Sequence, residues 1–203
     1  MQVNALCDRS ILLMKGKIAA VGAPLDVFNA YRELYVEHEN KRLGDQHEKE
    51  VLSPIAGDGA VSVTKVVFRD AAGEPSNAFF TGGPMTIELS VERHRPGNRY
   101  HVFIGFLMGS QYIGHIDSEN LITQDAVKSL AIDAERLIRI NIEQLVLLNG
   151  EFTLWILLQD AATRETITEY RGIGIFRVAK RHYPFDADSY FAQPVTSIEV
   201  DAS

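Results

Sequence analysis

From residue 60 to residue 178 the sequence is dominated by short runs in which apolar and polar residues alternate. A period of two places every second side chain on one face of a strand, so each run predicts a strand that is buried on one side. Turn-rich pieces such as DAAGEPSN, HRPGNR and LNGE separate the runs. The runs cover residues 60–69, 84–93, 100–108, 111–117, 135–145, 151–160 and 165–178, and VTSIEV near the C-terminus is compatible with one more. The pattern is mainly β and predicts an antiparallel β-sandwich of immunoglobulin-like type.

A different pattern precedes this domain. Residues 10–22, SILLMKGKIAAVG, are two apolar runs joined at Lys15-Gly16, which predicts a β-hairpin with Gly16 in the turn. Pro24 then suits a first helical position. An apolar stripe at helical spacing follows it, formed by Val27, Phe28, Tyr31, Leu34 and Tyr35. We therefore expect one helix after the hairpin.

The stretch from residue 37 to residue 50, EHENKRLGDQHEKE, is dense in charge and poor in apolar residues. Such a composition is typical of an exposed helical extension or a linker. It predicts a boundary between residues 1–50, which hold the hairpin, helix and linker, and residues 51–203, which hold the sandwich and a C-terminal tail.

Composition narrows the possible functions. The net charge of −7 and the pI of about 5.4 leave no basic field for nucleic acid or anionic lipid. At 46% hydrophobic residues, the 203-residue chain resembles a soluble globular protein with one good core. It holds neither a membrane-length apolar run nor a secretory signal pattern. The single Cys7 cannot form an internal disulfide, so a cytoplasmic location is expected.

Motifs for catalysis are missing from the sequence. There is no G-x-x-x-x-G-K-[ST] loop for nucleotide phosphates and no metal-binding aspartate after it, and GDGAVS at 57–62 runs into a strand. No G-x-S-x-G elbow is present, and the six histidines show no metal-ligand spacing. The carboxylates of Glu88, Glu92, Asp117 and Glu119 fit solvated surface charge better than a glycosidase pair. We expect no catalytic residue, no metal and no cofactor.

A candidate binding face follows from the alternation in EFTLWILLQ. If Phe152 and Leu154 point into the sandwich, Trp155 and Gln159 lie on the opposite face of the strand. The same argument turns the side chains of His101 and Phe103 outward in YHVFIGFL. Aromatic rings stack on the C–H faces of sugars, and amides or carboxylates bind their hydroxyls. The candidate carbohydrate-binding residues are Trp155, Gln159, His101, Phe103, Tyr112 and Asn98.

Other interpretations of these residues stay open. Trp155 would face the core if the phase of its strand were reversed, and an outward apolar patch would equally suit a dimer contact. We expect Arg93, Arg95 and Arg99 to lie in a solvated loop. The phenylalanines before TGG, Phe79 and Phe80, favour packing over recognition.

The two halves together resemble a known family. LCDRSILLMKGKIAAVGAPLDVFNAY is similar to the end of an ABC transporter ATPase domain. Joined to VTKVVFRDAAGEPSNAFFTGG and to a late LNGEFTLWILLQD, it resembles the C-terminal extension of the Wzt-type ATP-binding subunit of O-antigen polysaccharide exporters. This likeness covers residues 1 to about 180 and, over the β part, is a loose pattern.

The resemblance implies a cytoplasmic carbohydrate-binding domain, at the inner face of the inner membrane, that binds the modified end of a finished polysaccharide. It further implies a homodimer, in some relatives with exchanged C-terminal strands, and a membrane subunit contacted through an ATPase domain. This chain alone should not hydrolyse ATP, because the phosphate loop is missing. The alternative is an assembly domain that only dimerises ATPase subunits, and a glycan-modifying enzyme comes third.

Overall fold

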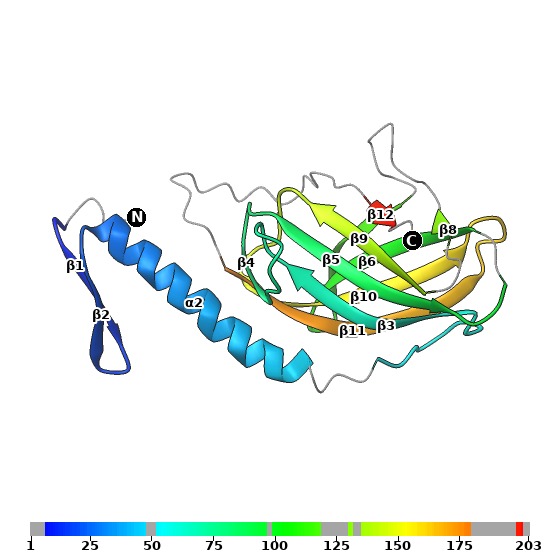
Figure 1. Ribbon diagram of the computed structural model, residues 1–203, viewed down its shortest axis with the longest axis horizontal. Helices are drawn as coiled ribbons and strands as arrows, with labels where there is room; N and C mark the ends of the chain where they lie inside the picture. The colour runs from blue at the N-terminus through cyan, green and yellow to red at the C-terminus, as the bar shows by residue number, and fades with distance from the viewer. Residues whose placement is uncertain are drawn as a thin grey trace.

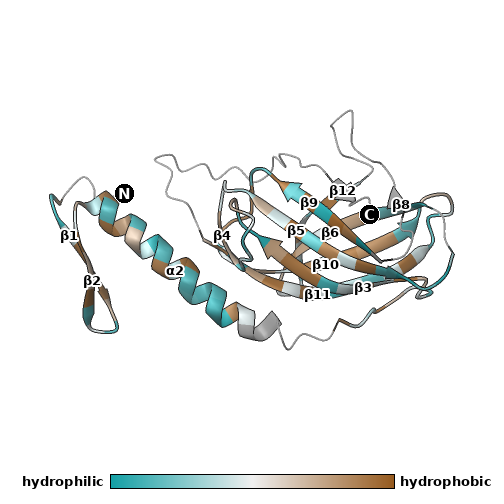
Figure 2. Cartoon of the chain, in the orientation of Figure 1, coloured by the Kyte–Doolittle hydropathy of each residue, from teal (hydrophilic) through white to brown (hydrophobic). Residues whose placement is uncertain are grey.

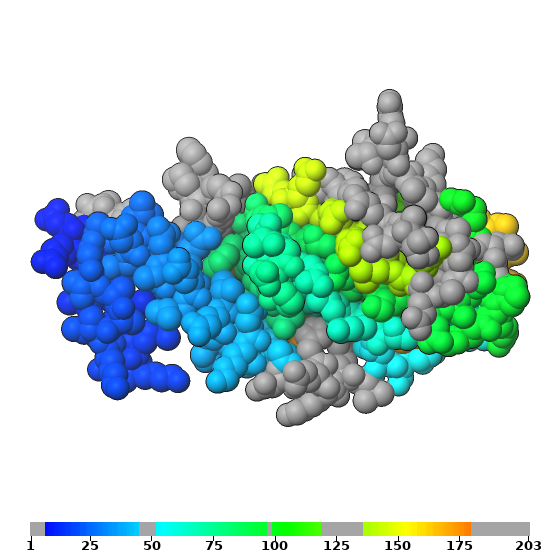
Figure 3. Space-filling model, in the orientation of Figure 1, coloured from blue at the N-terminus to red at the C-terminus, as the bar shows by residue number. Residues whose placement is uncertain are grey.

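The computed structural model describes residues 7–47, 52–96, 99–118, 130–131, 135–179 and 198–200 of the 203-residue chain. A hairpin and a long helix come first, and a β-sandwich follows (Figure 1). The hairpin lies at the end of the helix that is farther from the sandwich (Figure 1). In the space-filling view the hairpin projects away from the sandwich (Figure 3). The predicted order of elements is therefore confirmed, whereas the division at residue 50 stays a prediction.

The hairpin consists of β1 (Ser10–Met14) and β2 (Lys17–Gly22), which pair antiparallel. Lys15 and Gly16 between them have φ angles of 49° and 77°. Two consecutive positive φ values are typical of the turn that suits the twist of a two-stranded hairpin. The turn predicted at Gly16 is confirmed.

Helix α2 extends from Pro24 to His47, through the charged stretch that was expected to be an exposed extension or a linker. Pro24 occupies its first position, and Asp26 lies in the first turn, where a carboxylate suits the helix dipole. The helix is largely hydrophilic (Figure 2). Its apolar stripe is covered unevenly, because Val27 is buried whereas Tyr31 is exposed.

The second half of α2 contacts the sandwich through polar side chains. Arg42 donates a hydrogen bond from Nη2 to Glu151 Oε2 at 2.7 Å. Asn40 Oδ1 accepts a hydrogen bond from the backbone N–H of Asn77 at 2.6 Å, and Leu43 beside them is fully buried. This half of the helix is therefore attached to the sandwich.

The sandwich is built from two sheets. The first has the order β4-β11-β10-β6-β7, with β8 also paired to β6, and the second has the order β12-β9-β5-β3. Neighbouring strands of the described chain run antiparallel except for β4 and β11, which are parallel. The strands are β3 (Val61–Arg69), β4 (Ala78–Phe80), β5 (Met85–Arg93), β6 (Arg99–Met108), β7 (Gln111–Asp117), β8 (Leu130–Ala131), β9 (Glu135–Ile142), β10 (Gly150–Asp160), β11 (Thr166–Ala179) and β12 (Ile198–Val200).

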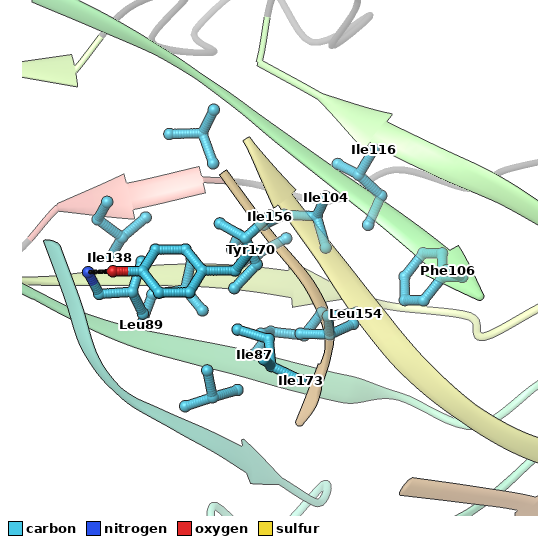
Figure 4. Packing of buried hydrophobic residues seen from close by; sticks show 14 of the residues in the cluster. Ile87, Leu89, Ile104, Phe106, Ile116, Ile138, Leu154, Ile156, Tyr170 and Ile173 are labelled. Carbon is cyan, nitrogen blue, oxygen red and sulfur yellow. Dashed lines mark hydrogen bonds between the residues drawn. The ribbon is translucent and has the colours of Figure 1, made fainter. Parts of the chain in front are cut away.

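The core lies between the sheets and follows the predicted alternation. Four side chains of β10 are at most 2% exposed: Phe152, Leu154, Ile156 and Leu158. Leu154 and Tyr170 from the first sheet point toward Ile87 and Leu89 of the second (Figure 4). The hydroxyl of Tyr170 accepts a hydrogen bond from the backbone N–H of Val63 at 3.1 Å. Because these residues face inward, the residues between them, including Trp155, face outward.

Glu88 lies on the outer side of the second sheet, yet only 5% of it is exposed. Arg69 Nε donates to its Oε2 at 2.7 Å, and Arg139 Nε donates to its Oε1 at 2.9 Å. Burial by itself would raise the pKa of Glu88, but the hydrogen bonds from Arg139 and Arg69 outweigh it and lower the pKa. The two arginines therefore balance the charge of Glu88 on the outer side of the second sheet.

The chain between the helix and the sandwich pairs with the edge of β11. Ile55 N donates to Glu169 O at 2.7 Å, and Glu169 N donates to Ala56 O at 3.0 Å. Gly57 has a φ of 114°, and a Cβ at this position would collide with the carbonyl group of Ile167. Glycine is required here, and GDGAVS is a turn leading into β3, as predicted.

The phenylalanines before TGG pack as expected. Phe79 is buried, with its ring centroid 6.4 Å from that of Phe68, and the guanidinium of Arg32 lies over the ring of Phe80. Among the described residues no helix is long and apolar enough to cross a membrane.

Candidate functional site

Aromatic side chains gather on the outer face of the first sheet. We define the aromatic patch as Trp155 on β10, Phe103 on β6, and Tyr112 and His115 on β7. The ring of Trp155 is edge-on to Phe103 at 5.0 Å and to Tyr112 at 6.2 Å, measured between centroids. Phe103 stacks on His115 at 4.8 Å. The structure therefore brings together three of the predicted site residues.

Gly105 makes room for this packing. It lies directly opposite Trp155 in the pairing of β6 with β10. A Cβ on Gly105 would be 3.1 Å from Phe103 Cε1 and 3.2 Å from Trp155 Cε3. Both distances are tighter than ordinary van der Waals contact, so a side chain here would push the two rings apart.

A β-bulge places both β7 residues of the patch on one face. Residues three apart in a regular strand point to opposite faces. In β7, however, His115 pairs with Gly105 while Tyr112 pairs with Leu107, so the strand holds one extra residue at this point. The bulge turns Tyr112 and His115 to the same side, where the hydroxyl of Tyr112 and Nδ1 of His115 share a hydrogen bond.

Two charged residues of β11 complete the surroundings of Trp155. The indole Nε1–H donates to Glu169 Oε1 at 2.9 Å, and Arg171 Nε donates to the same oxygen at 2.8 Å. The guanidinium carbon of Arg171 lies 4.1 Å from the centroid of the Trp155 ring. Glu169 therefore holds both the indole and the cation that stacks on it.

The backbone of β11 is irregular just after Arg171, whereas at Glu169 it is held by hydrogen bonds. Gly172 and Gly174 have positive φ angles of 71° and 63°, and the pairing of β10 with β11 shifts beside them. Bulges of this kind redirect side chains at functional surfaces. Glu169, in contrast, is held at both its backbone N–H and its C=O by Ile55 and Ala56.

The other predicted site residues lie farther along the same face or outside the described chain. Gln159 and His101 face each other across β10 and β6, four residues along the strand from Trp155. That separation is about 13 Å at a rise of about 3.3 Å per residue. His101 is largely buried, and Gln159 donates to the carbonyl of Arg164 at 3.2 Å. Asn98 lies outside the described residues.

Three members of the site, Glu169, Arg171 and His115, were not predicted from the sequence. Glu169 and Arg171 flank the inward Tyr170 in TEYRG, so period two along β11 would have turned both toward the face of Trp155. His115 could not be placed in the same way, because its orientation depends on the bulge.

The site combines flat apolar surface with hydrogen-bonding groups. Tyr112 is 45% exposed, and burial of part of its ring raises the pKa of its hydroxyl. Glu169 and Arg171 balance each other in charge. Among the described residues no group of histidine, cysteine and carboxylate side chains is arranged to hold a metal ion. Such a surface suits a ligand that offers C–H faces and hydroxyl groups.

Fold and surface together define the class as a β-sandwich domain with an aromatic patch on one outer face. The chain is similar to the crystal structure of the C-terminal domain of wzt, with a TM-score of 0.55 and 12% identity. That match covers 73% of this chain and 95% of the other, and it shows a shared fold. A Niemann-Pick type C2 protein from the Japanese carpenter ant aligns with a TM-score of 0.41 and 7% identity, covering 65% of this chain and 100% of the other. No protein-family model and no curated protein matches the sequence.

Proposed function

We propose that this chain is a carbohydrate-binding module that recognises the modified end of an O-antigen-type polysaccharide for an ABC exporter. The observation that carries the proposal is the aromatic patch, where Trp155, Phe103 and Tyr112 meet beside the hydrogen-bonding Glu169 and Arg171. The fold shared with the wzt domain is consistent with it.

The proposed mechanism is binding without catalysis. Sugar C–H groups pack against the exposed ring of Tyr112 and the half-buried rings of Phe103 and Trp155, while ligand hydroxyls exchange hydrogen bonds with Glu169. In this proposal the module works in the cytoplasm as a homodimer. An ATPase domain connects it to the membrane subunit and drives transport.

Helix α2 supports the idea of a connecting element. Its second half is attached to the sandwich through Arg42 and Asn40, while the hairpin at its other end exposes Ile11, Leu13 and Ile18. Exposed apolar strands of this kind mark a surface that contacts another protein. We propose that the covering surface belongs to the ATPase domain.

Isothermal titration calorimetry tests the proposal. The purified chain is titrated with the delipidated O-polysaccharide of the organism that encodes it, and with the same polymer lacking its terminal modification. We expect binding of the finished polymer only, and a loss of about fivefold or more in affinity for Trp155→Ala, since an aromatic contact contributes about 1 kcal/mol or more. Glu74→Ala, which changes an exposed side chain in the turn before β4 and outside the aromatic patch, is the control.

A second candidate function is assembly. On the sandwich, Met108, Tyr112, Val146 and Leu148 are exposed apolar side chains, and such residues also suit a contact between two copies. Sedimentation of wild type and Met108→Asp at several concentrations distinguishes the two. The assembly function is favoured if the wild-type dimer dissociates on this substitution and the wild-type protein binds neither polymer.

A further inference from the structure

Arg171 occupies the surface on which a ligand would stack. Its guanidinium carbon lies 4.1 Å from the centroid of the Trp155 ring, so one face of the indole is covered. About half of the Arg171 side chain is exposed, yet two contacts hold it in place. One is the stacking on the ring, and the other is the 2.8 Å hydrogen bond from Nε to Glu169 Oε1.

These contacts form a closed group of three side chains. Trp155 Nε1 and Arg171 Nε both donate to Glu169 Oε1, and Arg171 in turn stacks on Trp155. Moving the guanidinium off the ring therefore breaks a cation–π contact and an ion pair together.

We propose that Arg171 is a specificity-determining residue of the site, because its guanidinium competes with the ligand for the face of Trp155. The proposal rests on the proposed function, in which this patch binds a glycan. A planar cation and a sugar C–H face stack on an indole in the same place, so both cannot be there at once. Stacking of the ligand on this face of Trp155 requires that Arg171 move away.

The competition defines what a ligand must provide. Displacing Arg171 removes one donor from Glu169 Oε1, and the Glu169 side chain is only 15% exposed. A ligand recovers this loss when it brings a hydroxyl or N–H donor beside its C–H face. A sugar ring that is blocked at that hydroxyl, or a purely apolar ligand, leaves the carboxylate with a missing partner and binds more weakly.

Tryptophan fluorescence tests the covering directly, because Trp155 is the only tryptophan in the chain. We expect Arg171→Ala and Arg171→Gln to increase the quenching of Trp155 by acrylamide, since both remove the guanidinium from the ring. Arg95→Ala is the matched control, because Arg95 is an exposed arginine in the loop after β5 that also pairs with a carboxylate, that of Asp58. It should leave quenching unchanged.

The same variants are then titrated with the delipidated O-polysaccharide. We expect Arg171→Ala to bind about three- to tenfold more tightly than wild type, which corresponds to the contacts that no longer have to be broken. Unchanged quenching, or equal or weaker binding by the folded variants, overturns the role of Arg171 while leaving glycan binding intact. Failure of wild type and every variant to bind the polymer overturns the proposed function and this inference together.

Discussion

Replacing Glu88 by glutamine should destabilise the sandwich and change how its stability depends on pH. Glu88 is 5% exposed and accepts hydrogen bonds from Arg69 and Arg139 at 2.7 and 2.9 Å. Removing one partner of a buried ion pair costs about 3–5 kcal/mol. Both arginines are about one third exposed and can be rehydrated, so we expect a loss of about 2 kcal/mol for Glu88→Gln.

The direction of the pH dependence follows from the pKa of Glu88. Because the arginines hold that pKa below the ordinary value of 4.5, the unfolded chain binds the proton more tightly than the folded one. The stabilisation is therefore complete above the ordinary value and is lost as the pH falls through the folded pKa. The gap between wild type and Glu88→Gln should be full near neutral pH and should narrow below about pH 4.5.

Urea unfolding of both proteins across the range from about pH 7 to about pH 3 measures this gap. Comparison with the variant is needed because the pKa of Glu39 is also lowered: burial alone would raise it, but hydrogen bonds from Arg42 outweigh that effect. Glu74→Gln, in the exposed turn before β4, is the control and should track wild type. A gap that stays constant with pH, or one that widens in acid, would show that the charge of Glu88 does not stabilise the folded chain in this way.

Three further predictions concern stability and dynamics. Gly57→Ala should lower the free energy of unfolding by more than about 2 kcal/mol, because Gly57 has a φ of 114° and the new Cβ would collide with the Ile167 carbonyl. Gly59→Ala should cost only about 1 kcal/mol, because Gly59 has a φ of 71° and its new Cβ would meet no atom. Equal losses for the two variants in urea unfolding would contradict this prediction. Leu154→Ala should cost about 2–5 kcal/mol because this side chain is fully buried, and a loss under about 1 kcal/mol in thermal unfolding would speak against the core described here. Arg42→Ala should accelerate amide hydrogen exchange in the second half of α2, whereas exposed Lys41→Ala should not, and identical exchange in the two variants would mean that Arg42 does not hold the helix.

The alternation of apolar residues was sufficient to predict most of the sandwich. The run at 151–160 became β10 (Gly150–Asp160), with Trp155 on the outer face as the chosen phase required. Alternation succeeds there because each inward residue of β10 is buried in a two-sheet core. The hairpin turn at Gly16 was readable for a different reason, since few residues other than glycine tolerate its φ.

Features that depend on tertiary contacts were not readable from the pattern. Strand β4 (Ala78–Phe80) is too short to alternate, and it exists through parallel pairing with the distant Ala179 end of β11. The extra residue in β7 reverses the phase between Tyr112 and His115. Gly114 in QYIGHID is compatible with a bulge, but the position of the extra residue follows only from the pairing with β6. The stacking of Arg171 on Trp155 likewise requires knowledge of which strand neighbours β10.

Nuclear magnetic resonance of the Trp155 indole N–H shows whether a glycan binds at the aromatic patch. Trp155 is the only tryptophan, so a ¹⁵N-labelled chain gives one indole signal, from the group that donates to Glu169. Titration with the finished, delipidated O-polysaccharide should shift this signal, together with the amides of Gly105 and His115. Saturable shifts confined to another part of the chain, with the indole signal unmoved, would rule out binding at the aromatic patch.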